Sequence, residues 1–280
     1  MACHLRCSRD MKKPVVNTRT FCENVAKNWP LYICSSGISA LQLRTAPRRA
    51  PLLRRHQHML KLLILGLLRS ASSEWCVVTG ASSGIGEHLA LQAAERGYDV
   101  VLHGRRRGAL HRLKKAIEAQ YPGRSTKMVV EDLATQRGAQ RVHAACKGLD
   151  VRLLFSTAGV ARVQPVVDDD GIDAMLALNV RASTELCRRF GRDMAEAGGG
   201  RVVLTASLVG VPAHGCAGAA AYAASKAYLR SFGNALHDEL TPRGVSVTTV
   251  LPGAVDTPLR RPRAWMRAGA SCSACPGGAY

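Results

Sequence analysis

A glycine-rich turn between an apolar run and an amphipathic helix constrains this chain more than any other stretch. The run at residues 75–78 has the length and composition of a buried parallel strand. Gly80, Gly84 and Gly86 follow it, and apolar residues then recur at helical spacing. A strand that leaves such a turn as a helix presents free backbone N–H groups to an anion, as a pyrophosphate site does. The alternative is an ordinary loop rich in glycine and serine.

Downstream of residue 74, short apolar runs alternate with helical patterns. This rhythm predicts an α/β domain with a doubly wound parallel sheet, the Rossmann fold. Six strands are expected, at residues 75–78, 99–103, 126–130, 151–155, 201–205 and 245–251. The helices between them are expected to include two long ones, at residues 172–197 and 221–240.

The net charge of +19 is concentrated at the two ends of the chain. Residues 1–72 hold 13 lysines and arginines against 2 acidic residues, residues 73–258 hold 22 against 18, and residues 259–280 hold 4 against none. We therefore expect a basic, poorly ordered N-terminal extension, one folded domain and an irregular C-terminal tail. Nucleic-acid binding is not predicted, because no basic helix with interleaved aromatic residues falls in the central domain.

The extension is rich in arginine and poor in acidic residues, as organelle transit peptides are. If residues 1–58 are such a peptide, the protein belongs to a mitochondrion or plastid. The alternatives are a disordered extension or a chain that starts at Met11 or Met59, and the protein would then be cytoplasmic. The apolar run at residues 60–68 is too short to span a bilayer, which takes about 20 residues. It is compatible with a signal-type apolar segment, an interfacial anchor or a helix packed on the domain, so peripheral membrane contact at most is predicted.

The ten cysteines do not predict a metal site. Those between Cys76 and Cys216 have no ligand spacing and are expected to be free thiols of a reducing compartment. Cys272 and Cys275 form one CxxC pair in the tail, without a second pair or a nearby histidine, so zinc is not expected.

Tyr222 and Lys226 lie four residues apart in a predicted helix and therefore on one helical face. A lysine ammonium close to a phenol favours the phenolate, which brings the tyrosine pKa from about 10 toward the range of a general acid or base. The alternative is a surface pair on an ordinary helix. Because the pair follows a dinucleotide-type turn and Ser207 at a strand end, the catalytic interpretation is favoured.

With these motifs together, residues 75–259 resemble the short-chain dehydrogenase/reductase family. The motifs occur in the family's order and on the expected elements. They are Thr79-Gly80-Ala81-Ser82-Ser83-Gly84-Ile85-Gly86, Asp132-Leu133, Ala158-Gly159, Asn179, Ser207, Tyr222 with Lys226, and Pro252-Gly253 with Thr257.

The resemblance implies reversible hydride transfer between a nicotinamide cofactor and a carbonyl or alcohol. Tyr222 would exchange a proton with the substrate oxygen, and Ser207 would hydrogen-bond that oxygen. Lys226 would lower the tyrosine pKa and hold the ribose, and Asn179 would keep a water in the proton relay. The implied cofactor contacts are Gly80, Ser82, Ser83, Gly84, Ile85 and Gly86 at the turn, Asp132 and Leu133 at the adenine, Ala158, Gly159, Tyr222 and Lys226, and Pro252, Gly253 and Thr257 at the carboxamide.

The end of the second strand predicts which cofactor is used. An acidic residue there would bind the ribose hydroxyls and repel a 2′-phosphate, but this chain has Gly104 followed by Arg105-Arg106-Arg107. A guanidinium group binds a phosphate through two parallel hydrogen bonds. We therefore expect NADP(H) in preference to NAD(H), with Arg105 as the leading contact. A solvated arginine loop is the alternative.

The chain departs from the family pattern at two places. Ser156 and Thr157 replace two asparagines before Ala158-Gly159, which is expected to weaken sheet support and the adenine pocket because hydroxyls form fewer hydrogen bonds than amides. Only 27 residues follow Gly253, where family members continue through a substrate lid, a helix and a seventh strand. We expect no C-terminal seventh strand, an exposed edge at residues 245–251 and a substrate site that is open or completed by a partner subunit.

Two functions of different classes follow. The proton-relay residues favour an NADP(H)-dependent oxidoreductase that interconverts a carbonyl and an alcohol. The short C-terminus favours a catalytically weak NADP-binding protein that acts through cofactor binding or dimerisation. The small apolar loop at residues 208–220 favours an apolar substrate. The resemblance implies a homodimer or homotetramer built through the helices at residues 172–197 and 221–240.

Overall fold

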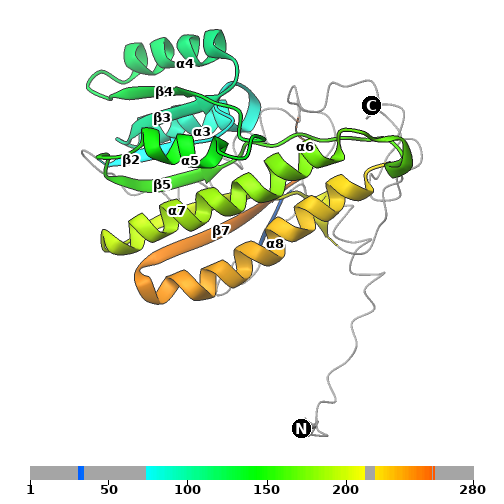
Figure 1. The fold of residues 1–280 in the computed structure, drawn as a ribbon. Helices are drawn as coiled ribbons and strands as arrows, with labels where there is room; N and C mark the ends of the chain where they lie inside the picture. The colour runs from blue at the N-terminus through cyan, green and yellow to red at the C-terminus, as the bar shows by residue number, and fades with distance from the viewer. Residues whose placement is uncertain (1–30, 35–73, 212–217, 254, 256–280) are drawn as a thin grey trace, which may run out of the picture.

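The computed structural model describes residues 31–34, 74–211, 218–253 and 255. Its strands form one sheet in the order β1-β7-β6-β5-β2-β3-β4 (Figure 1). The six strands from β2 to β7 run parallel, which confirms the predicted fold, and the predicted bounds hold to within one residue. They are β2 (Trp75–Val78), β3 (Asp99–Gly104), β4 (Thr126–Val130), β5 (Val151–Ser156), β6 (Gly200–Thr205) and β7 (Val245–Pro252).

Helices pack on both faces of the sheet, as right-handed crossovers between parallel strands require. One face carries α3 (Gly84–Glu95) and α4 (Arg107–Gln120), and the other carries α5 (Gly138–Ala145), α7 (Ser183–Glu196) and α8 (Ala220–Leu240) (Figure 1). The described ranges also contain the 3₁₀ helices η1 (Val166–Asp168), η3 (Leu208–Gly210) and η4 (Thr241–Arg243). None of the helices within the described ranges is long and apolar enough to cross a membrane.

The long helix expected at residues 172–197 is not one regular α-helix. It begins as α6 (Ile172–Leu176), widens into a π-helical segment, η2 (Ala177–Ala182), and continues as α7. π-Helical turns inside α-helices are frequent at functional sites, and this one contains Asn179.

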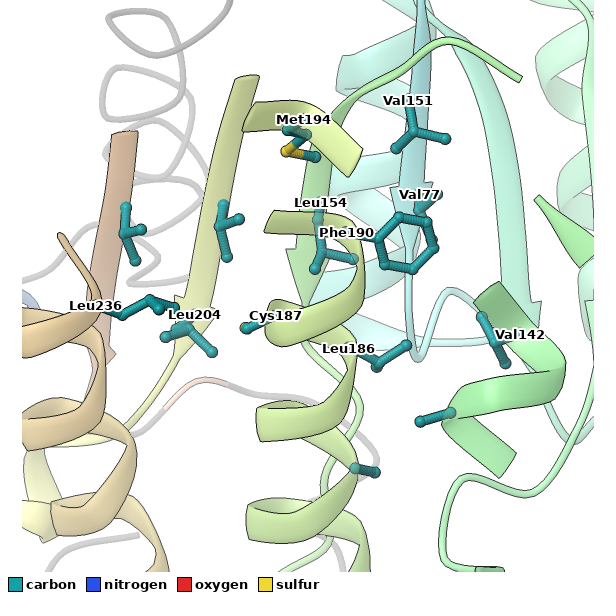
Figure 2. Packing of buried hydrophobic residues seen from close by; sticks show 14 of the residues in the cluster. Val77, Val142, Val151, Leu154, Leu186, Cys187, Phe190, Met194, Leu204 and Leu236 are labelled. Carbon is teal, nitrogen blue, oxygen red and sulfur yellow. The ribbon is translucent and has the colours of Figure 1, made fainter. Parts of the chain in front are cut away.

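Alternating residues of the buried strands supply two apolar cores, one for each face of the sheet. In β2, Val77 belongs to the core under α5, α7 and α8, whereas Cys76 and Val78 belong to the core under α3 and α4. Figure 2 shows Leu186 and Phe190 of α7 reaching toward the sheet and α5 in the first core. Cys76, Cys146 and Cys187 are buried free thiols, as expected, and burial raises the pKa of each; for Cys146 it rises to about 11 and for Cys187 to about 12.

A strand from the N-terminal extension covers one edge of the sheet. β1 (Leu31–Cys34) pairs with β7 in the antiparallel sense, from Leu31 opposite Pro252 to Cys34 opposite Thr249. The sequence patterns did not predict this strand. The expectation of an exposed edge at β7 was therefore wrong, because β1 supplies its backbone hydrogen-bond partners. The expected absence of a C-terminal seventh strand concerns residues outside the described ranges.

Candidate active site

The glycine-rich turn has the backbone and the free space that a pyrophosphate requires. Gly80 adopts φ +72°, a left-handed conformation that favours glycine. A β-carbon on Gly86 would collide with the carbonyl oxygen of Gly80, so the first turn of α3 lies directly on the loop. The backbone amide of Ala81 donates to the carbonyl of His103 at 2.9 Å, which holds the loop against the end of β3. These features fit a bound dinucleotide at the N-terminus of α3.

Thr79 fastens this turn to the neighbouring strand β5. Its buried hydroxyl donates to the carbonyl of Phe155 at 3.2 Å and accepts the backbone amides of Thr157 at 2.9 Å and Ala158 at 3.1 Å. The ends of β2 and β5 are therefore joined by the side chain of the residue that directly follows β2. The expectation that Ser156 and Thr157 weaken sheet support and the adenine pocket stays a prediction.

A row of threonines connects the turn to Lys226 across three adjacent strands. The hydroxyls of Thr157 and Thr205 lie 3.4 Å apart, and the Nζ of Lys226 donates to the carbonyl of Thr205 at 2.8 Å. Because β5 lies between β2 and β6, these contacts place Lys226 at the same carboxyl edge of the sheet as Thr79. In open α/β sheets, ligands bind at this edge.

Ser207, Tyr222 and Lys226 are brought together at this edge. Ser207 follows β6 and begins η3, where its hydroxyl accepts the amide of Val209 at 3.3 Å. It is also hydrogen-bonded to the Tyr222 hydroxyl. Tyr222 and Lys226 are both buried in the first turns of α8, and the lysine Nζ lies 5.9 Å from the centre of the tyrosine ring. Three groups that can handle a proton or hydrogen-bond an oxygen are thus adjacent.

Burial governs the charges of these groups. It raises the pKa of Tyr222 to about 12, and the hydrogen bond with Ser207 opposes that rise. Burial also lowers the pKa of Lys226 to about 8. We expected Lys226 to lower the tyrosine pKa, but the net shift is upward because the desolvation of a buried phenolate outweighs the opposing hydrogen bond. Tyr222 is therefore a protonated phenol at neutral pH, whereas Lys226 is largely charged.

Asn179 lies in η2 and is completely buried. Its Oδ1 accepts the backbone amide of Val160 at 3.0 Å, and its Nδ2 donates to the carbonyl of Val160 at 2.9 Å. The same Nδ2 donates to the hydroxyl of Ser225 at 3.2 Å. A β-carbon on Gly159 would lie 3.1 Å from Oδ1, so the asparagine closes tightly over the segment that follows β5.

The segment at the end of β3 holds the residues that we expected to choose the cofactor. A β-carbon on Gly104 would lie 3.3 Å from the side chain of Ser82, which leaves little room for an acidic residue. The Nη1 of Arg105 lies 3.6 Å from the Oδ2 of Asp132, and both side chains are largely exposed. The Nη2 of Arg106 donates to the carbonyl of Ser82 at 2.8 Å. Arg106 therefore contacts the glycine-rich turn directly, whereas Arg105 pairs with Asp132 after β4.

Of the other predicted cofactor contacts, Leu133, Pro252 and Gly253 are described in the structure. Leu133 is buried after β4, and Pro252 ends β7, where its carbonyl accepts the Ser207 hydroxyl at 3.4 Å. Gly253 follows it directly, and Thr257 lies outside the described residues.

The sequence analysis assigned no individual role to four residues that build this site, namely Thr79, which it named only as part of the turn motif, and Thr205, Gly210 and Ser225. A β-carbon on Gly210 would lie 2.5 Å from backbone atoms of Lys226 and Ala227, so η3 rests directly on α8. The signal for Ser225 is visible in the sequence, because it stands between Tyr222 and Lys226. The roles of the other three depend on contacts between elements far apart in the sequence, which no linear pattern shows.

Comparison with known proteins agrees with this geometry. Residues 74–267 match the family model described as short chain dehydrogenase. The very-long-chain 3-oxoacyl-CoA reductase of Emericella nidulans is 31% identical over 183 residues, which cover 63% of this chain and 52% of that protein, so the chain spans about half its length.

Two solved structures have the same fold. The bulky-bulky ketone specific alcohol dehydrogenase from Comamonas testosteroni gives a TM-score of 0.61 at 28% identity, over 65% of this chain and 73% of that one. A short-chain dehydrogenase from Sphingobium yanoikuyae in complex with NADPH gives 0.63 at 30% identity, over 70% and 75%. Because the family model matches well over half of the sequence, this chain belongs to the short-chain dehydrogenase/reductase family.

Proposed function

We propose that this chain is an NADP(H)-dependent oxidoreductase that interconverts a carbonyl and an alcohol. The observation that carries the proposal is the burial of Tyr222 and Lys226 beside Ser207, at the sheet edge where the glycine-rich turn also lies. A protonated phenol, a hydroxyl and an ammonium group converge there. This set can bind a carbonyl oxygen and give it a proton.

Each group has a role that follows from its position. The Tyr222 hydroxyl donates its proton to the carbonyl oxygen, and the Ser207 hydroxyl hydrogen-bonds that oxygen. The Lys226 ammonium stabilises the phenolate that remains, because the two groups share one buried site. The bound nicotinamide supplies the hydride to the carbonyl carbon. Since burial keeps Tyr222 protonated at neutral pH, the site is poised for reduction of the carbonyl.

The preference for NADP(H) rests on charge and space at the end of β3. Arg105 and Arg106 place two positive charges directly after β3, with Arg106 hydrogen-bonded to Ser82, and Gly104 leaves no acidic group to repel a 2′-phosphate. The NADPH complex of the Sphingobium relative is consistent with this choice.

The first test is fluorescence titration of the purified protein with NADPH and NADH. We expect tighter binding of NADPH, and Arg105→Asp should remove that advantage. Arg243→Asp is the control, because it makes the same change of charge at an exposed position in η4, which precedes β7, and three strands lie between β7 and β3 in the sheet. Failure to bind either cofactor would overturn the proposal. Binding without turnover of any carbonyl would favour the catalytically weak NADP-binding protein.

The substrate that fits best is an apolar ketone. The backbone amide of Gln164 donates to the carbonyl of Gly218 at 2.7 Å, which ties the loop after β5 to the start of α8, close in sequence to Tyr222. On this loop Val166 and Val167 are 50% and 90% exposed, so apolar surface is available near the N-terminus of α8. Steady-state reduction of ketones of increasing apolar size should show KM falling with size, and a preference for small polar carbonyls would contradict this assignment.

We also propose a homodimer through α7 and α8. Tyr228 is 40% exposed on α8, stacks on Phe232 with ring centres 5.7 Å apart, and bonds the hydroxyl of Thr184 on α7 at 3.0 Å. A partly exposed aromatic pair on α8, joined to α7 through Thr184, suits an interface between copies. Light scattering should give twice the chain mass for the wild type and the monomer mass for Tyr228→Glu.

A further inference from the structure

One buried hydroxyl, that of Ser225, joins three segments of the site. Ser225 lies in α8 between Tyr222 and Lys226 and is almost completely buried. Its Oγ donates to the carbonyl of Tyr222 at 2.7 Å and accepts the Nδ2 of Asn179 at 3.2 Å. The single hydroxyl hydrogen is used on Tyr222, and a lone pair of the oxygen accepts from Asn179. The two bonds together fix the rotamer of the serine.

The hydrogen-bonding groups of Asn179 are correspondingly committed. Both N–H groups of its amide are used, one on Val160 and one on Ser225, and its oxygen holds the Val160 amide. The side chain therefore cannot rotate without leaving buried polar groups unpaired, which costs about 1–3 kcal/mol for each group. The result is a continuous chain of hydrogen bonds from Val160 through Asn179 and Ser225 to Tyr222.

This series of hydrogen bonds connects three segments whose relative positions matter for catalysis. Val160 follows Gly159 at the end of β5, Asn179 belongs to η2, and Tyr222 belongs to α8. α8 is the element that carries the proton donor, and the segment after β5 borders the cofactor site. A shift between them would move the Tyr222 hydroxyl relative to the carbonyl that it must protonate.

We propose that Ser225 is a positioning residue, which holds Tyr222 in register with Asn179 and with the segment after β5. The proposal rests on the oxidoreductase function proposed above. Ser225 does not touch the substrate or the cofactor in this role; it acts through Tyr222. Loss of its hydroxyl should therefore reduce turnover far more than cofactor binding.

The test compares Ser225→Ala with Ser231→Ala, which makes the same change at an exposed position on the same helix. We expect Ser225→Ala to keep its NADPH dissociation constant within about twofold and to lose about tenfold or more in kcat, because small displacements of a reacting group are costly. Ser231→Ala should change neither. Thermal melting of both variants checks that each is folded at the assay temperature.

A second measurement does not depend on activity. The protein labelled with 3-fluorotyrosine is studied by ¹⁹F NMR, and the Tyr222 signal is assigned by its loss in Tyr222→Phe. We expect Ser225→Ala to shift or broaden this signal and Ser231→Ala to leave it unchanged.

The outcomes separate this inference from the proposed function. A Ser225→Ala protein with wild-type kcat or an unmoved Tyr222 signal overturns the positioning role while the enzyme assignment stands. A wild type that reduces no carbonyl, combined with a signal that moves in Ser225→Ala, overturns the function while the positioning of Tyr222 stands. A parallel loss of NADPH binding in Ser225→Ala would show a general structural role and also overturns the inference.

Discussion

Gly210 packs so closely on α8 that a β-carbon there would lie 2.5 Å from the carbonyl carbon of Lys226. The neighbouring atoms belong to the helix backbone and cannot rotate away, so any side chain at residue 210 must displace η3. Ser207 begins η3 and is hydrogen-bonded to Tyr222. A single glycine thus sets the distance between two groups of the proposed proton relay.

Gly210→Ala is therefore expected to lower kcat about tenfold or more, because it separates Ser207 from Tyr222. It should also lower the melting temperature, since overpacking commonly costs about 1–3 kcal/mol. Gly108→Ala is the control: it lies in α4, where the nearest atom to an added β-carbon is 3.8 Å away. Steady-state kinetics and thermal melting of the two variants check the prediction, and equal kcat values would contradict it.

Removal of the proton donor separates catalysis from binding. Tyr222→Phe keeps the buried ring but loses the hydroxyl, so kcat should fall by about 10²–10⁴. NADPH affinity should change little, because the phosphate contacts proposed at Arg105 and Arg106 are unaffected. Fluorescence titration and turnover measured on one preparation decide this. Residual turnover near that of the wild type would assign the proton to another group.

The pH dependence of reduction should follow Lys226. Tyr222 stays protonated up to a pKa of about 12, whereas Lys226 loses its charge through a pKa of about 8. We expect kcat/KM for reduction to be level below about pH 7 and to fall above about pH 8. Lys226→Arg should move the fall to higher pH, because a guanidinium group keeps its charge. A wild-type profile that stays level to about pH 10 would contradict this assignment.

The free energy of unfolding should also depend on the protonation of Lys226, but with the opposite sign. The folded pKa of Lys226 lies below its ordinary value, so between about pH 8 and pH 10 the unfolded chain binds more protons at this residue and stability rises with pH. The sign follows from the cost of burying the ammonium, which disappears as the group becomes neutral. Lys226→Met should lack this contribution. Urea titrations of both proteins across the same pH range measure the difference in slope.

Thr79→Val tests the connection between β2 and β5. Valine has the same shape, but it cannot accept hydrogen bonds from the backbone amides of Thr157 and Ala158 or donate one to the carbonyl of Phe155. Because these groups are then left without that partner, the free energy of unfolding should fall by about 2 kcal/mol or more. Thr79→Ser keeps the hydroxyl and should be much closer to the wild type. Chemical denaturation of both variants provides the comparison.

The sequence predicted those parts of the protein that are encoded locally. Apolar runs and glycine positions located the six parallel strands and the turn before α3, and spacing placed Tyr222 and Lys226 on one helical face. The π-helical segment around Asn179 was missed because its residues keep an ordinary helical pattern. The structural roles of Thr79 and Gly210 were not predicted because their partners lie on other elements, the segment after β5 for Thr79 and α8 for Gly210. The sequence predicted a lowered pKa for Tyr222, but burial raises it, and the degree of burial is set by tertiary packing.

β1 has a consequence for the order in which the sheet can be completed. Leu31 pairs with Pro252, so two positions that are adjacent in the sheet lie 221 positions apart in the sequence (252 − 31). During synthesis β1 precedes the other described strands, but its partner β7 is made only when nearly all of the domain has left the ribosome, whereas β2 can already pair with β3. Closing so large a loop gains little until the intervening strands are folded. Of the described strands, β1 is therefore the first to be synthesised and the last to join the sheet.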